Sequence, residues 1–137
     1  MATVWRAHDN LLARRVAVKK LHPQPHLDAG ELATRFERAR REARNAARIS
    51  HPNVVVVHDV VDDDGLPIIV MEYVPSSTLG DLVETHGPVP FEEAARIGRG
   101  VIGALRAAHR AGVLHRDVKP AISGSAAVHD KPPPGPR

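Results

Sequence analysis

Short runs of apolar and β-branched residues, separated by turn residues, predict four strands in the first half of the chain. The runs form two pairs, and they cover residues 4–7, 16–21, 54–61 and 67–74. Asp9-Asn10 lies in the turn of the first pair, and an aspartate-rich segment that ends in Gly65 lies in the turn of the second. We therefore expect two β-hairpins that form an antiparallel sheet.

A spacing of three and four between apolar residues predicts a helix of about five turns after the first hairpin. Its apolar stripe consists of Leu32, Phe36, Ala39, Ala43, Ala46 and Ile49. A brief helix is expected at residues 79–84, and a longer one from Pro90 to Gly112 with Glu92 and Glu93 in its first turn. Together the hairpins and helices predict an α+β fold.

Residues 121–137 differ in composition from the rest of the chain. They contain Pro132-Pro133-Pro134-Gly135-Pro136 and almost no apolar periodicity, which predicts a disordered tail. The whole chain of 137 residues is 42% apolar, enough for a core of one domain. It has no cysteine, and no apolar run approaches the roughly 18 residues of a membrane helix. We expect a cytoplasmic protein.

The formal net charge of +3 is concentrated on the first long predicted helix. Glu31 precedes Arg35 by four residues and Glu37 precedes Arg41 by four, which favours two ion pairs on the helix surface. The arginines then left unpaired are Arg40, Arg44 and Arg48. A basic stripe is typical of nucleic-acid binding, but only 3% of the residues are aromatic, so stacking partners for bases are scarce. A solvated helix face is favoured, and nucleic acid is not an expected partner.

Gly98, Gly100 and Gly103 satisfy the G-x-G-x-x-G pattern of a dinucleotide site. In such a site the pattern follows a strand and opens a helix, because the amides at the helix N-terminus bind the phosphate. These glycines lie inside a predicted helix instead. We interpret them as small residues that allow close helix packing.

Five motifs occur in one order along the chain, and this order is more specific than any motif alone. They are Thr3-Val4-Trp5-Arg6-Ala7, Val16-Ala17-Val18-Lys19, Arg41-Glu42-Ala43, Met71-Glu72-Tyr73-Val74 and His115-Arg116-Asp117-Val118-Lys119-Pro120. The set resembles the serine/threonine protein kinases, in particular their bacterial eukaryotic-like branch. The resemblance covers residues 1–120, with the small lobe at 1–74 and the start of the large lobe at 75–120. It implies ATP-dependent phosphorylation of a protein substrate.

The resemblance implies a pair of charged residues at the phosphates of ATP. Lys19 corresponds to the strand lysine that contacts the α- and β-phosphates, and Glu42 corresponds to the helix glutamate that pairs with this lysine. Glu42 also lies at the edge of the apolar stripe of its predicted helix, from which it can reach inward toward a strand.

The resemblance further implies an adenine site. Met71 corresponds to the gatekeeper residue, and backbone groups of Glu72 and Val74 correspond to those that bond the adenine. Val4 and Ala17 correspond to part of the apolar roof over the base. Without the resemblance, all of these residues would be interpreted as ordinary strand residues.

The last motif corresponds to the catalytic loop. Asp117 matches the base that accepts the proton of the substrate hydroxyl, and Lys119 matches the residue that meets the transferring phosphate. His115 and Arg116 would brace the loop. In the family an asparagine five residues after the aspartate binds magnesium, but here this position is Ile122, which has no oxygen in its side chain.

Two other parts of the family pattern are not found in the sequence. There is no Asp-Phe-Gly, and only Met1-Ala2 precedes Thr3 where a first strand and a glycine-rich loop are expected. We therefore expect a truncated kinase domain without magnesium ligands, with little or no turnover by itself and with residues 3–7 as an unprotected sheet edge. The alternative is a non-catalytic nucleotide-binding or protein-interaction module. The sequence leaves the oligomeric state open.

Overall fold

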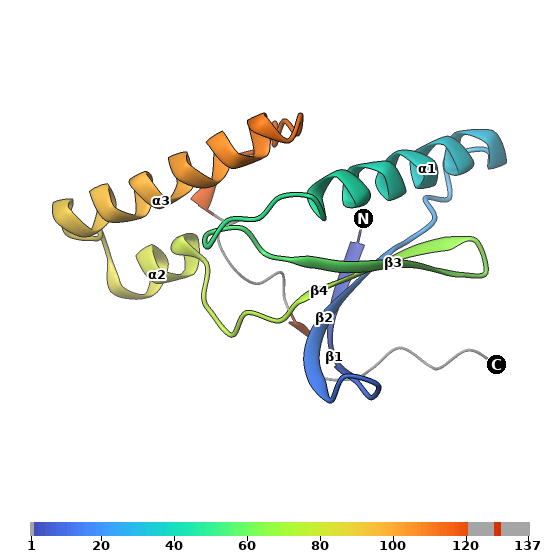
Figure 1. Ribbon diagram of the computed structural model, residues 1–137, viewed down its shortest axis with the longest axis horizontal. Helices are drawn as coiled ribbons and strands as arrows, with labels where there is room; N and C mark the ends of the chain where they lie inside the picture. The colour runs from blue at the N-terminus through green and yellow to red at the C-terminus, as the bar shows by residue number, and fades with distance from the viewer. Residues whose placement is uncertain (1, 121–127, 130–137) are drawn as a thin grey trace.

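The structure is a computed structural model that describes residues 2–120 together with 128 and 129. Its elements are a mixture of strands and helices (Figure 1). In chain order they are β1 (Ala2–Asp9), β2 (Arg14–Leu21), α1 (Ala29–Ala46), β3 (Val57–Asp63), β4 (Leu66–Glu72), α2 (Leu79–His86), α3 (Phe91–Arg110) and β5 (Val128–His129). The two predicted hairpins, the predicted helices and the α+β fold are confirmed, with shifts of a few residues at the element ends.

The strands form one sheet in the order β3-β4-β2-β1-β5. The β1–β2, β2–β4 and β3–β4 pairs are antiparallel, whereas β5 is parallel to β1. Helix α1 packs against β3 and β4. Figure 1 shows α2 and α3 at the other end of the molecule, beyond the connection that leaves β4.

Both hairpin turns contain residues with a left-handed backbone. In the first turn, one carboxylate oxygen of Asp9 accepts the N–H groups of Leu11 and Leu12 at 3.1 Å each, and Ala13 has φ of 49°. In the second turn Asp64 and Gly65 have φ of 50° and 79°, as the predicted aspartate–glycine hairpin requires. These turns fix the registers of the two hairpins.

Helix α1 begins with a reciprocal cap and is attached to the sheet by an arginine. Asp28 accepts the N–H of Glu31 at 2.8 Å, and Glu31 accepts the N–H of Asp28 at 3.0 Å. Phe36 and Ala43 are buried against the sheet. Arg40, only 12% exposed, donates to Asp62 and to the carbonyl of Gly65, the latter at 2.9 Å. The hydrogen bond to Asp62 raises the pKa of Arg40.

The predicted charge pairing on α1 was wrong. Glu31 is engaged in the helix cap, and Arg35 donates to Gln24 at 2.7 Å instead. Glu37 pairs with Arg40 at 2.7 Å, so Arg40 is not part of an unpaired stripe. The spacing of charges on a helix gives possible pairs, but partners from loops and strands decide which of them form.

Helix α3 packs on the loop that follows α1. A Cβ atom on Gly103 would lie 3.1 Å from Nε2 of His51, and one on Gly100 would lie 3.4 Å from Oδ1 of Asn53. A Cβ on Gly98 would meet nothing within 4 Å. The interpretation of these glycines as packing residues is confirmed for Gly100 and Gly103.

The structure adds one strand that the sequence did not predict. Val128 and His129, inside the segment predicted to be a disordered tail, pair with β1. The remainder of that segment lies outside the described residues. An edge strand offers unpaired backbone groups, so even two residues without strong strand periodicity can pair with it. Among the helices of the described part of the chain, none is long and apolar enough to cross a membrane.

Candidate nucleotide site and catalytic loop

The register of the sheet brings four of the predicted nucleotide-binding residues onto one face. Val4 is opposite Lys19, and Ala17 is opposite Met71. Directly opposed residues in an antiparallel sheet project to the same face, as do residues two apart on one strand. Ala17 and Lys19 are two apart on β2, so Val4, Ala17, Lys19 and Met71 share a face.

Helix α1 covers the same face at the β3–β4 end of the sheet. Pro67 and Ile69 are two apart on β4, and Ile69 is opposite Lys19. Asp62, directly opposite Pro67, receives the hydrogen bonds of Arg40 on α1. Pro67 is among the residues that are less than 2% exposed. Lys19 and α1 therefore lie on one side of the sheet, as a lysine–glutamate pair between them requires.

The expected pair between Lys19 and Glu42 is not formed in this structure. Glu42 accepts a hydrogen bond from Nε of Arg38 at 2.9 Å, and its side chain is 64% exposed. Phe36 and Ala43 define the buried stripe of α1, so Glu42 lies at the boundary of that stripe and meets Arg38 one turn earlier. A role for Glu42 at the phosphates stays a prediction.

The start of the segment after β4 is held by two contacts. The guanidinium of Arg15 on β2 lies 5.5 Å from the ring centre of Tyr73, a cation–π contact that no sequence pattern indicated. Glu72 donates its N–H to the carbonyl of Val56 at 2.8 Å. Val74, whose backbone is expected to bond the adenine, is 40% exposed.

A second reciprocal cap begins α2 directly after this segment. Thr78, only 5% exposed, accepts the N–H of Asp81 at 2.9 Å, while Asp81 accepts the N–H of Thr78 at 3.0 Å. The hydroxyl of Thr78 is the main cause that lowers the pKa of Asp81. The connection between the sheet and the helices is therefore ordered at the point where it enters α2.

The predicted catalytic residues lie on an exposed loop after α3. Asp117 pairs with Lys119 at 3.0 Å, and their side chains are 65% and 53% exposed. Nδ1 of His115 accepts the N–H of Asp117 at 3.3 Å, and Arg116 has φ of 63°. Asp117 and Lys119 are brought together, but neither bonds to Lys19 in the described structure. The left-handed backbone at Arg116 is unfavourable for a non-glycine residue, and it turns the chain sharply at the aspartate.

A magnesium ion has few candidate ligands here. Within residues 2–120, 128 and 129, no three His, Asp or Glu side chains are grouped as a metal site. Asp117 is bonded to a lysine, and the residue at the family's asparagine position is Ile122, whose side chain has no donor atom. The described residues around the catalytic loop thus form no complete magnesium site.

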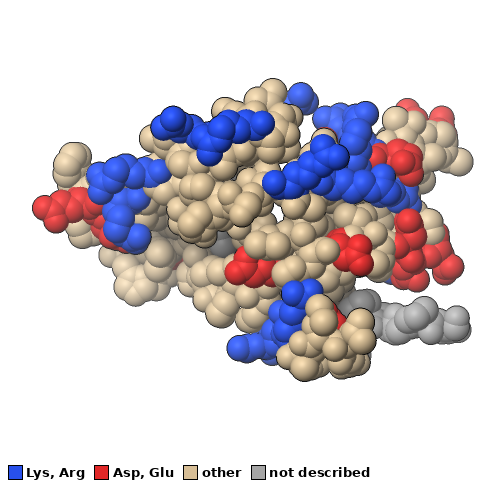
Figure 2. Space-filling view, in the orientation of Figure 1, with Lys and Arg blue, Asp and Glu red and all other residues tan. Residues whose placement is uncertain are grey.

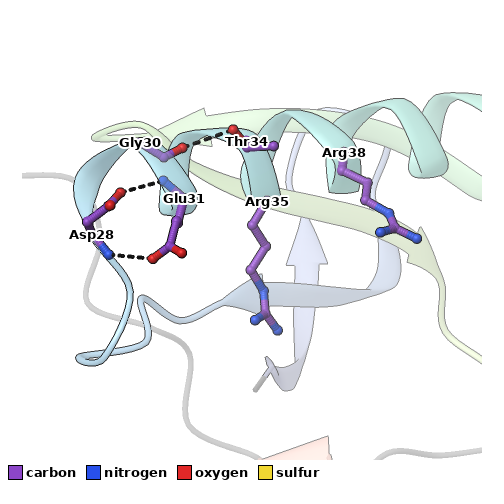
Figure 3. Close-up of a pocket in the computed structure, with 6 residues that line it drawn as sticks. All are labelled: Asp28, Gly30, Glu31, Thr34, Arg35 and Arg38. Carbon is purple, nitrogen blue, oxygen red and sulfur yellow. Dashed lines mark hydrogen bonds between the residues drawn. The ribbon is translucent and has the colours of Figure 1, made fainter.

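Two shallow, open hollows lie elsewhere, on the outer side of α1. The first is lined by Asp28, Gly30, Glu31, Thr34, Arg35 and Arg38 (Figure 3). The second continues along the helix past Glu37 to Arg41 and Arg44, where arginine side chains gather on the surface (Figure 2). None of the predicted site residues lines either hollow.

Comparison with known families explains the arrangement of the sheet and loop. Residues 1–121 match the family model described as protein kinase domain, and the chain belongs to the protein kinase family. Members of this family use ATP and magnesium in general.

Several bacterial relatives are named serine/threonine protein kinases. PknB of Mycobacterium leprae is 43% identical over 135 residues, which cover 93% of this chain and 21% of the relative. PrkC of Bacillus subtilis is 38% identical over 120 residues, which cover 88% of this chain and 18% of the relative. The chain therefore spans about a fifth of the length of the curated relatives it matches.

Solved kinase structures superpose on this chain. The kinase domain of Mycobacterium tuberculosis PknI superposes with a TM-score of 0.72 at 35% identity, over 86% of this chain and 47% of that one. Rad53 residues 1–466, solved in complex with AMP-PNP, superposes with a TM-score of 0.73 at 28% identity, over 88% of this chain and 30% of that one. The predicted kinase-like fold is confirmed.

Proposed function

We propose that residues 1–120 form the ATP-binding part and the catalytic loop of a serine/threonine protein kinase domain. The observation that carries the proposal is the common face of Val4, Ala17, Lys19 and Met71 on the sheet. Rad53, which shares the fold, is solved with an ATP analogue, and this supports a nucleotide as the ligand. A protein serine or threonine is the proposed acceptor, and the cytoplasm is the proposed compartment.

The residues around the proposed nucleotide have separate tasks. Ala17, 8% exposed, and Val4 present apolar surface to the base, while Met71 bounds the pocket at the end of β4. The backbone of Glu72 and the N–H of Val74 orient the adenine edge by hydrogen bonds. Bound ATP supplies the phosphoryl group for transfer.

Charged residues complete the proposed mechanism. Lys19, which projects from the sheet, neutralises the negative charge of the phosphates. Glu42 orients Lys19 after the bond between Glu42 and Arg38 has broken. Asp117 accepts the proton of the substrate hydroxyl at its carboxylate. Lys119, 3.0 Å from that carboxylate, stabilises negative charge on the group in transfer.

We further propose that the polypeptide of residues 1–137 does not catalyse phosphoryl transfer by itself. Ile122 cannot replace the asparagine that holds magnesium in the family. In phosphoryl transfer the protein acts mainly through positioning and electrostatic stabilisation, so a missing metal ligand removes a large part of catalysis. The alternative is a non-catalytic nucleotide-binding or protein-interaction module. The apolar residues Val4, Ala17 and Met71 on one face of the sheet also favour its nucleotide-binding form.

Calorimetry with ATP and adenosine, each with and without magnesium, tests the proposal. We expect both ligands to bind with similarly weak affinity and magnesium to have little effect. Lys19→Ala should lower the affinity for ATP slightly, because Lys19 is the one proposed phosphate contact, and should leave the affinity for adenosine unchanged. Lys20→Ala is the matched control, because Lys20 projects to the other face and pairs with Asp63 at 2.7 Å. If adenosine fails to bind, the adenine site is refuted. A strong preference for magnesium-ATP that is lost in Lys19→Ala would show that groups other than the family's glycine-rich loop and asparagine hold the phosphates and the metal.

A further inference from the structure

The two edges of β1 differ in how they are paired. On its inner side, all of β1 pairs with β2, from Ala2 opposite Leu21 to Asp9 opposite Arg14. On its outer side, within the described residues, β1 pairs only with β5 (Figure 1). This pairing is parallel and places Val128 beside Val4 and His129 beside Trp5.

An unpaired strand edge presents a row of N–H and C=O groups to any other extended chain. Proteins cover such edges with very short strands and with prolines, which cannot extend the pairing. The C-terminal segment combines both features. β5 has two residues, and the sequence has Pro120 before it and Pro132-Pro133-Pro134 after it. The segment is therefore suited to close an edge without offering a new one.

We propose that the outer edge of β1 is a strand-docking site and that its occupant is Val128–His129 of the chain's own C-terminal segment. The family match ends at residue 121, so the occupant comes from sequence that the kinase domain does not supply. Docking of these two residues prevents the outer edge of β1 from pairing with a second copy of the chain. It also covers the backbone of Val4, a residue of the proposed adenine site. The inference rests on strand pairing alone and stands whether or not ATP binds.

Engineered cysteines test the docking directly, because the chain has none of its own. The pair Val4→Cys and Val128→Cys places two thiols at one register position of adjacent strands, a separation that a disulfide can span. The control pair is Val61→Cys and Val128→Cys, since β3 lies at the opposite edge of the sheet. Under mild oxidation of the monomer, we expect an intramolecular disulfide in the first pair only. Its absence, or equal yields for both pairs, would overturn the proposal.

Proline substitutions in the full chain test the consequence. Consecutive residues of a strand direct their N–H groups to opposite edges, so only one of Val128 and His129 can donate its N–H to β1. Proline has no N–H, so substituting that residue by proline removes a backbone hydrogen bond between β5 and β1. That variant should speed amide exchange in residues 3–6 by about tenfold or more and should form dimers or larger species in light scattering. The control Lys131→Pro should do neither. If both variants keep the exchange rates and remain monomeric, β5 does not protect the edge.

Discussion

Glu42 bonds to Arg38, one turn earlier on α1, at 2.9 Å, although the helix also faces the side of the sheet that carries Lys19. Both partners are more than half exposed. An exposed pair of this kind contributes little, because water screens the charges and two long side chains must be ordered. The Arg38 pair is therefore a weak competitor for Glu42, and we expect a nucleotide bound at the proposed site to release Glu42 toward Lys19.

The first prediction compares two arginines of the same helix. Arg38→Ala should change the free energy of unfolding by less than about 0.5 kcal/mol, the usual limit for an exposed pair. Arg40→Ala should cost about 1–2 kcal/mol, because Arg40 is mostly buried and bonds to Asp62, Glu37 and Gly65. Urea unfolding followed by circular dichroism measures both values. Equal losses in the two variants would show that α1 is not anchored through Arg40.

The second prediction concerns the contact between α3 and the loop after α1. Gly98→Ala should stabilise the chain by up to about 1 kcal/mol, because the added methyl meets open space and alanine favours the helix. Gly103→Ala should gain nothing or lose stability, since its methyl would lie 3.1 Å from His51. His51 cannot yield freely, because its Nδ1 accepts the N–H of Asn53 at 3.1 Å. The melting temperatures of the two variants, compared with that of the wild type, show whether each substitution raises or lowers stability.

The hairpins and the long helices were predictable because their causes are local. An Asp64–Gly65 turn between two apolar runs specifies a hairpin, and the register next to the turn follows from the turn. The common face of Ala17 and Lys19 follows from the two-residue period of a strand. Local patterns therefore place these residues on one face, whereas their assignment to a nucleotide site came from the order of the family motifs.

The features that sequence reasoning missed depend on partners far apart in the chain. Arg40 pairs with Glu37 on its own helix, but it also bonds to Asp62 from β3, and the spacing of charges on the helix did not indicate that bond. Tyr73 lies over Arg15 from β2, and β5 pairs with β1 across more than a hundred residues. No period in the sequence encodes such contacts, because they form only when the sheet has been assembled.

The third prediction is a pH dependence that originates in the first hairpin turn. The pKa of Asp9 lies below its ordinary value of 3.8, mainly because its carboxylate accepts the N–H of Leu12. A lowered pKa in the folded state stabilises the fold above the unfolded pKa, and this contribution is lost as pH falls through the folded value. Stability should therefore drop below about pH 4.

Asp9→Asn isolates the contribution of this carboxylate. The amide oxygen can still accept the N–H groups of Leu11 and Leu12, but it does not titrate. The variant should lose less stability than the wild type between pH 5 and pH 2, as melting temperatures across this range would show. Parallel curves for the two proteins would mean that other carboxylates, such as Asp81 with its lowered pKa, cause the acid sensitivity.

The last prediction concerns catalysis by the polypeptide itself. Residues 1–137 should not transfer phosphate from ATP to themselves or to a generic basic protein, because Ile122 stands where the family binds magnesium. A radiolabel assay with magnesium and with manganese measures this, and an active bacterial relative serves as the positive control. Asp117→Asn separates true activity from contamination, since only transfer catalysed by this chain depends on that carboxylate. Incorporation in the wild type that disappears in Asp117→Asn would show that the metal is held by residues other than the family's asparagine, and the proposal of inactivity would be withdrawn.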